Sequence, residues 1–205
     1  MTNLIDDLPA VCEFFELPTH YSAARILAEE WRDSVIFESF SKGFVSSHKA
    51  GQFYRQMAGG WYEKFNTIYG EASRILEAKL TDYFNKRIKQ CQTMGDKIKC
   101  YKKLESALIC AGMVGFLNNA FAFLAETIKV SGLPTKWNNT PNTLPILDGI
   151  ADFSGQELII RHAKPGEYYK NPLPITSAEL MAKNDPKAFL LDQQTERQKI
   201  KKGRR

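Results

Sequence analysis

Apolar positions recur at helical spacing in three parts of the chain. Between Glu71 and Gln90 they fall every three or four residues, which places them on one face of an α-helix. The segment from Ser22 to Arg32 has the same spacing, and Ser22 is a suitable N-cap residue. The stretch from Asp96 to about Val130 continues the pattern and becomes almost wholly apolar. These segments predict that helices form most of the core.

Two other regions have the composition of short strands. Aromatic and β-branched residues dominate from Val35 to Tyr69, and Gly59-Gly60 is the best candidate for a hairpin turn. From Leu144 to Ile160 apolar residues alternate around Asp148-Gly149 and Ser154-Gly155, which predicts a second hairpin of two or three strands. The expected fold class is therefore α+β: a mainly helical core with two small antiparallel β elements, an aromatic hairpin near 37–64 and a hairpin near 144–160.

The same patterns predict one domain with an appendage at each end. Residues 1–20 form an N-terminal segment, residues 21–175 a single α+β domain, and residues 176–205 a helical, basic C-terminal tail. The tail helix is expected to break near Asp185-Pro186, because proline lacks the amide hydrogen that a helix interior needs. The length of 205 residues is sufficient for a core of ordinary size.

The apolar stretch from Ala107 to Ala125 raises the question of a membrane. It has nineteen residues without a charge, which is long enough to cross a bilayer. Asn118 and Asn119 lie near its middle, where polar groups are costly in hydrocarbon, and no second span accompanies it. A buried core helix is therefore the preferred interpretation, and a single membrane span remains the alternative.

Basic residues are concentrated in two segments. The formal net charge is +5, and the last ten residues alone carry six basic groups and one acid. A second concentration runs from Arg74 to Lys103, with nine basic and three acidic groups. Clustered cations bind polyanions by releasing counterions from phosphates, so this distribution indicates a nucleic-acid partner. The alternative is a solvated surface with a frayed tail.

The predicted interface combines these cations with neighbouring aromatic residues. Tyr83 and Phe84 fit the apolar face of their helix and are expected to face the core, whereas Tyr101 is a candidate for stacking on a base. Contacts of this kind go to phosphate and give affinity without sequence specificity. The predicted nucleic-acid-binding residues are Lys86, Arg87, Lys89, Lys97, Lys99, Lys102, Lys103, Arg197, Lys199, Lys201, Lys202, Arg204 and Arg205.

The four cysteines are not arranged as a metal site. Cys12, Cys91, Cys100 and Cys110 form no C-x-x-C pair and have no histidine at zinc-ligand spacing, so we expect small buried hydrophobic residues. The N-terminus MTNLIDDLPA is acidic and lacks the apolar segment of a secretory signal. A cytoplasmic location is expected.

No complete catalytic motif is present in the sequence. A P-loop, a G-x-G-x-x-G and a G-x-S-x-G are all missing, and His20, His48 and His162 are isolated. Asp148 and Asp152 could contribute to a two-metal site, although the glycine beside Asp148 favours a turn role. We therefore expect no catalytic residue, metal or cofactor, while a site assembled from distant residues remains an open alternative.

One segment resembles a known family. Residues 137–173 (WNNTPNTLPILDGIADFSGQELIIRHAKPGEYYKNPL) are similar to the stretch that precedes the superfamily 3 helicase in primase-helicases of phages, plasmids and poxviruses. The motif residues are Asp148, Gly149, Asp152 and Gly155, and the string Gly60-Trp61-Tyr62 resembles the family's aromatic hairpin. Asp148 stands where the family has Asn, and a second Trp is missing, with Phe65 or Tyr69 in its place.

The resemblance implies a non-catalytic accessory domain for DNA replication in a phage, plasmid or other mobile element. Such a domain would position DNA or a partner for a replicative helicase or primase supplied in trans. The family's ATPase residues have no counterpart here, so a stand-alone relative, one part of a split protein or an excised domain is expected. The alternative is a protein-interaction or oligomerisation module that does not bind DNA.

Overall fold

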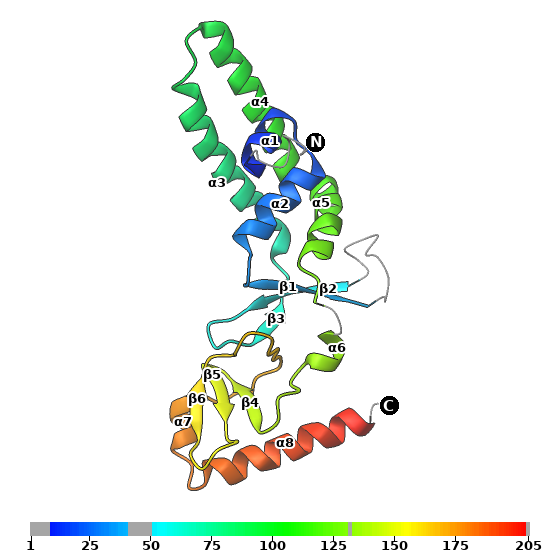
Figure 1. Cartoon of the computed structure of the whole chain (residues 1–205), viewed down its shortest axis with the longest axis vertical. Helices are drawn as coiled ribbons and strands as arrows, with labels where there is room; N and C mark the ends of the chain where they lie inside the picture. Colours follow the sequence, from blue (N-terminus) through cyan, green and yellow to red (C-terminus); the bar gives the residue numbers. More distant parts are fainter. Residues whose placement is uncertain (1–8, 41–50, 131–132, 204–205) are drawn as a thin grey trace, which may run out of the picture. The chain divides into compact units, whose positions relative to one another are not determined.

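The computed structural model describes residues 9–40, 51–130 and 133–203, with the side chains of all of these except 134, 135 and 201–203. The fold is α+β, with helices and two small three-stranded sheets, as the sequence predicted (Figure 1). The chain divides into two compact units, Met1–Phe53 with Phe65–Val130 and Tyr54–Lys64 with Ser131–Arg205, where the sequence predicted one domain over 21–175 and a separate tail.

The first unit is built mainly from five helices: α1 (Ala10–Glu16), α2 (His20–Glu30), α3 (Ile68–Ile88), α4 (Met94–Gly112) and α5 (Val114–Thr127). Their apolar faces meet in one core, which includes the fully buried side chains of Phe15, Leu76 and Phe121. Helix α1 lies in the segment assigned to an N-terminal appendage, yet Phe14 and Phe15 are both 0% exposed. The sequence did not predict this helix, because it is short and its apolar residues stand among acidic ones.

Helix α2 begins two residues before the predicted N-cap. Thr19 is the N-cap, and its hydroxyl accepts a hydrogen bond from the Ser22 amide at 3.1 Å. Ser22 sits at the third helical position and completes a capping box, so its assignment as N-cap was wrong. Thr and Ser both cap helices well, and the sequence pattern did not separate them.

The apolar stretch 107–125 is not one continuous helix. It is interrupted at Met113, where α4 ends and α5 begins, and the two axes differ by 77°. Leu117, Phe121 and Leu124 are buried in the first unit, whereas Ile109 and Val114 are more than half exposed. Among the described residues no single helix has the length and hydropathy to cross a bilayer, although the bent pair α4–α5 satisfies both together.

The aromatic region forms the predicted strands β1 (Val35–Ser39), β2 (Gly51–Gln56) and β3 (Tyr62–Lys64), in the order β1-β2-β3. Strands β2 and β3 are antiparallel, with Gln56 opposite Tyr62. Gly59-Gly60 lies in the turn between them, as predicted, and the Gly60 amide donates to Met57 O at 2.8 Å. The chain passes from one unit to the other within β2 and again after β3.

The second unit contains the other antiparallel sheet and three helices. Its elements are α6 (Leu133–Lys136), β4 (Thr143–Ile146), β5 (Gly149–Asp152), β6 (Ile159–Arg161), α7 (Ser177–Met181) and α8 (Pro186–Gly203). The turn between β4 and β5 consists of Leu147 and Asp148, so Gly149 is a strand residue and not the turn residue that the sequence suggested. A Cβ at Gly149 would lie 2.7 Å from Ile160 Cγ2, which explains why glycine stands there. The predicted break before Pro186 is confirmed by the gap between α7 and α8.

Two glycines are expected to respond in opposite directions to alanine substitution. Gly60 has φ +80° and a Cβ there would lie 3.0 Å from Ala163 N, so Gly60→Ala should lower the free energy of unfolding by about 1–2 kcal/mol. Gly70 is in α3 with open space around it, so Gly70→Ala should raise that free energy by up to about 1 kcal/mol. Urea unfolding of both variants measures this; a stabilising Gly60→Ala would contradict the left-handed turn.

Candidate nucleic-acid interface

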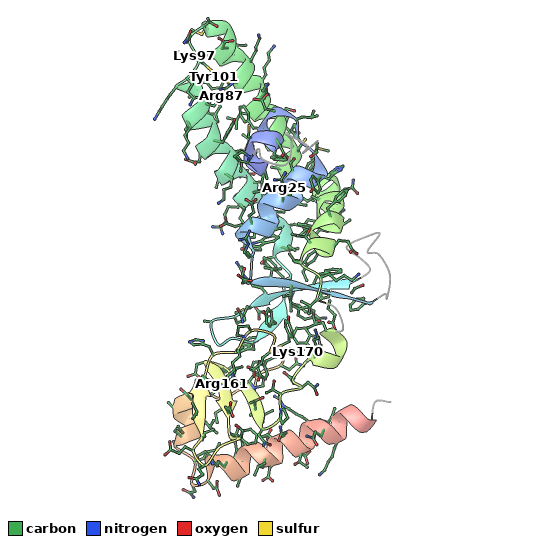
Figure 2. The ribbon with its side chains drawn as sticks, in the orientation of Figure 1. Arg25, Arg87, Lys97, Tyr101, Arg161 and Lys170 are labelled. Atoms are coloured by element: carbon green, nitrogen blue, oxygen red, sulfur yellow. The ribbon has the colours of Figure 1, made fainter. Side chains whose placement is uncertain are left out.

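The basic segment 74–103 folds into the helical hairpin α3–α4. Every fourth residue of α3 from Ala72 to Phe84 is buried, and α4 buries Cys100, Ala107 and Ala111, so the two helices share one core and turn their charged faces outward. Thr93 caps α4 by accepting a hydrogen bond from the Asp96 amide at 3.1 Å. The predicted cations of this segment therefore surround the connected end of the hairpin, where Figure 2 labels Arg87, Lys97 and Tyr101.

Two of the seven predicted cations in the hairpin are held by carboxylates. Lys86 Nζ lies 2.7 Å from Asp82 Oδ2, and Lys103 pairs with Glu16 on α1. The other five have no carboxylate oxygen within 4.0 Å in the part of the chain that the structure describes. They are Arg87, Lys89, Lys97, Lys99 and Lys102, and all five are exposed. Exposed cations without carboxylate partners can contact phosphates at low desolvation cost.

A hollow of about 320 Å³ lies beside these cations. Arg87, Lys99 and Lys103 contribute positive charge, and Glu16 and Asp96 contribute negative charge. Two carboxylates offset two of the three cations, so the named residues leave the hollow with a formal charge of only +1. The exposed faces of α3 and α4 at the hairpin end, where Lys89, Lys97 and Lys102 have no carboxylate partner among the described residues, are therefore a better phosphate-binding candidate than this hollow.

Two cysteines lie at the same end of the hairpin. The sulfur atoms of Cys91 and Cys100 are 3.4 Å apart, and burial raises the pKa of the Cys100 thiol. A raised pKa keeps that thiol protonated at neutral pH, which makes it a poor nucleophile. Only Cys100 is fully buried; Cys12, Cys91 and Cys110 are partly exposed, so the prediction of four buried cysteines was too simple.

The aromatic residues of the hairpin divide between core and surface. Phe84 is buried, and Tyr83 packs on Phe15 while its hydroxyl donates to Cys12 Sγ at 3.0 Å, which confirms that both face the core. Burial and the contact with Cys12 raise the pKa of Tyr83 to about 12, so the hydroxyl remains a donor. Tyr101 is 57% exposed, with its ring centroid 5.0 Å from that of Phe84, and it is available for stacking.

The basic residues of the C-terminal tail lie on α8, in the second unit. Lys199 pairs with Glu196 at 3.2 Å, and burial lowers the pKa of the half-buried Arg197. The side chains of Lys201 and Lys202, and all of Arg204 and Arg205, lie outside the described residues. Arg197 and Lys199 are thus weaker candidates for phosphate contacts than the cations of the hairpin.

The two strings that carry the family resemblance come together in the second unit. The indole Nε1 of Trp61 donates to Leu147 O at 3.3 Å, and a Cβ at Gly59 would lie 2.8 Å from the same oxygen. Tyr62 is buried, and its amide donates to Tyr169 O at 2.7 Å. Residues 86 positions apart in the chain therefore form one substructure, although the sequence showed only their order.

The two acidic residues of the motif, Asp148 and Asp152, are engaged in internal contacts. Asp148 accepts hydrogen bonds from the Ser177 hydroxyl at 2.6 Å and amide at 2.8 Å, and these bonds lower the pKa of its carboxyl group. Asp152 accepts from Arg161 Nε at 2.8 Å and from Ser154 Oγ at 2.7 Å. Within the described residues no three His, Cys, Asp or Glu side chains are grouped to hold a metal. The two carboxylates therefore serve the sheet and the start of α7. Gly155, the last residue of the motif, has ample room for a Cβ.

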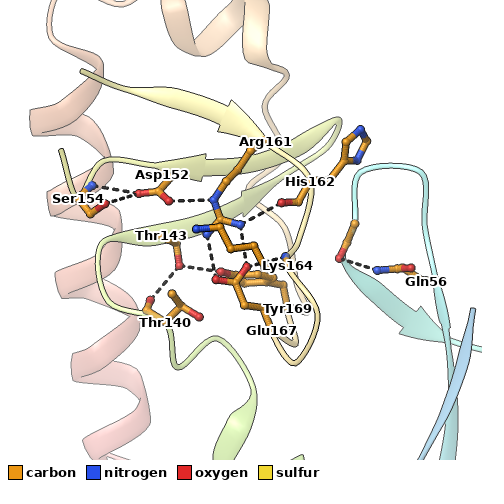
Figure 3. Close-up of polar contacts among 11 residues, drawn as sticks. Gln56, Thr140, Thr143, Asp152, Ser154, Arg161, His162, Lys164, Glu167 and Tyr169 are labelled. Atoms are coloured by element: carbon orange, nitrogen blue, oxygen red, sulfur yellow. Dashed lines mark hydrogen bonds and ion pairs between the residues drawn. The ribbon is translucent and has the colours of Figure 1, made fainter. Parts of the chain in front are cut away.

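Arg161 links two carboxylates and was not identified from the sequence. Its guanidinium donates to Asp152 and, through two nitrogens, to Glu167 at 2.7 and 3.0 Å (Figure 3). The three side chains are only 14–17% exposed. The only signal in the sequence was a single arginine at the end of an apolar strand, which gives no indication of its partners.

The stability of the second unit should fall at low pH because of this cluster. Burial alone would raise the pKa of Asp152, but hydrogen bonds from Ser154 and Arg161 lower it from 3.8 to about 2. The contribution is present above pH 3.8 and is lost as the pH falls towards about 2, and it amounts to about 2 kcal/mol. Urea unfolding at pH 5, 4, 3 and 2 measures the free energy of unfolding, which should fall less with decreasing pH for Asp152→Asn than for the unchanged chain. Equal decreases would contradict the depressed pKa of Asp152.

Comparison of the chain with protein-family models and with curated protein sequences found no match.

Proposed function

We propose that this chain is a non-catalytic accessory domain for DNA replication, of the kind found in phage and plasmid primase-helicases. It would bind nucleic acid without sequence specificity and hold it for a helicase or primase supplied in trans. The observation that carries the proposal is the set of five exposed cations at the end of the α3–α4 hairpin without carboxylate partners in the described structure. The resemblance of Gly60-Trp61-Tyr62 and Asp148-Gly149 to the family, and their contact through Trp61 and Leu147, adds support.

The mechanism is one of positioning. Phosphates would lie along the exposed faces of α3 and α4, where Lys89, Lys97 and Lys99 displace counterions. Tyr101 would stack on an unpaired base, which favours single-stranded over duplex DNA. The chemistry would belong to the partner, because this surface offers charge and an aromatic face but no activated nucleophile.

A titration of labelled DNA tests this proposal. Fluorescence anisotropy of single-stranded and duplex oligonucleotides should show binding at about 50 mM salt that weakens by at least tenfold at about 200 mM salt. Unrelated sequences of equal length should bind equally well. Absence of binding to either form at the lower salt concentration would refute nucleic-acid binding.

A second candidate function is a protein-interaction or oligomerisation module without DNA binding. The observation that favours it is the exposed apolar face of α4, where Met94, Ile98 and Ile109 are 50–72% exposed. The salt dependence of binding separates the two functions. The affinity of an apolar interface changes little between the two salt concentrations, whereas the affinity of a phosphate-binding interface falls strongly.

A further inference from the structure

Helix α4 has an apolar stripe on the side opposite the core of the first unit. Met94, Ile98, Tyr101 and Ile109 are separated by three, four or eight residues, which places them on one face at 3.6 residues per turn. Their exposed fractions are 72%, 50%, 57% and 58%. The face towards the core is made by Cys100, Ala107 and Ala111, which are all buried. The stripe is therefore a second apolar face, which the described part of the chain leaves uncovered.

A shallow depression runs along this stripe. It has a volume of about 520 Å³ and is lined mainly by apolar atoms. The lining residues are Ile98, Tyr101, Lys102, Leu104, Glu105, Leu108 and Ile109. A surface helix of a monomer normally presents polar residues on the side away from its core, so this pattern indicates a partner helix.

The stripe is in part complementary to its own reverse. Three pairs of exposed residues at equal distances on either side of the midpoint between Lys103 and Leu104 are identical or opposite in charge, whereas Tyr101 falls opposite Ser106. The matched pairs are Met94 with Met113, Ile98 with Ile109, and Lys102 with Glu105. In two antiparallel copies of the helix related by a two-fold axis at this midpoint, each pair comes to the same level along the seam. Isoleucine then meets isoleucine, and each lysine lies beside a glutamate.

We propose that the occupant of this face is a second copy of the same chain, bound antiparallel through α4. An isologous interface requires a surface that is complementary to itself, and the pairing of Lys102 with Glu105 supplies charge complementarity twice in each dimer. A parallel arrangement would place Lys102 beside Lys102 and is disfavoured by charge. This interface does not depend on nucleic-acid binding. It uses Tyr101 and Lys102, so these two residues would contact nucleic acid only in the monomer, whereas Arg87 and Lys99 line the hollow and lie outside the proposed seam.

Sedimentation velocity over roughly two orders of magnitude in protein concentration tests the proposal. The unchanged chain should show a monomer–dimer equilibrium that shifts to dimer as the concentration rises. Ile98→Asp and Ile109→Asp should each raise the dimer dissociation constant by more than about tenfold, because each places two charges in the seam. Ala78→Asp, at an exposed position on α3, is the matched control and should leave the constant unchanged. A chain that is monomeric at every concentration overturns the proposal.

Exchange of charges tests the antiparallel register. Lys102→Glu alone and Glu105→Lys alone should each weaken association about tenfold, because each creates two like-charge contacts in the dimer. The double variant Lys102→Glu/Glu105→Lys should restore the original constant within about threefold. Circular dichroism checks that helix content is unchanged in every variant. A double variant that is as weak as the single variants overturns the antiparallel pairing, even if the chain is a dimer.

Discussion

A variant with all seven hairpin cations changed to alanine is expected to bind DNA about a hundredfold more weakly than the unchanged chain at low salt. The changed residues are Lys86, Arg87, Lys89, Lys97, Lys99, Lys102 and Lys103. The loss follows from the counterions that these cations would release from phosphates. Fluorescence anisotropy at a fixed salt concentration measures it, and circular dichroism establishes that the hairpin remains helical.

We expect DNA affinity to depend on the position of the charges as well as on their number. The variant Lys89→Ala/Lys97→Ala/Lys99→Ala removes three exposed cations at the hairpin end, and Arg32→Ala/Lys64→Ala/Lys136→Ala removes three exposed cations elsewhere. The first triple should weaken binding about tenfold or more, and the second by no more than about threefold. Equal losses would show that net charge and not the hairpin governs binding. Retained affinity in the sevenfold variant would move the interface to the basic residues of α8.

Arg161→Ala is expected to lower the free energy of unfolding by about 3 kcal/mol. The substitution leaves Asp152 and Glu167 close together, mostly buried and without their common cation. Burial would then raise the pKa of both carboxyl groups. Urea denaturation at neutral pH measures the loss.

A triple variant provides the control for Arg161. Arg161→Met/Asp152→Asn/Glu167→Gln removes all three charges and keeps most of the volume, so it should recover at least half of the lost stability. If Arg161→Ala is as stable as the unchanged chain, the ion-pair network does not support the second unit. The hairpin cations lie in the first unit and Arg161 lies in the second. The Arg161 variants therefore change the stability of the chain without changing the residues proposed to bind DNA.

Local patterns were sufficient to predict most of the secondary structure. The spacing of Leu76, Leu80 and Phe84 identified α3 because one face of that helix packs on a single core. Gly59-Gly60 identified the β2–β3 turn because glycine accepts the positive φ found at Gly60. The exposure of the cations in segment 74–103 could also be predicted, because they occupy the helix positions between the buried apolar residues.

Features that depend on distant partners could not be predicted. Asp148-Gly149 has the composition of a turn, yet Gly149 pairs with Ile146 and belongs to β5, where Ile160 leaves no room for a Cβ. The division into two units arises because residues 54–64 leave the first unit to join residues that follow 130, a pairing with no local signal. Arg161 was missed for the same reason, because its carboxylates at 152 and 167 are recognisable only when β5, β6 and the following loop are folded.

The slope of DNA affinity against salt concentration tests the central claim most directly. The logarithm of the association constant should fall linearly with the logarithm of salt concentration for the unchanged chain, and the slope should become shallower by about two to three units in Lys89→Ala/Lys97→Ala/Lys99→Ala. This triple variant retains Lys102 and Glu105, so association through α4 should be unchanged. A slope identical to that of the unchanged chain would show that these cations do not contact phosphate and would contradict the account.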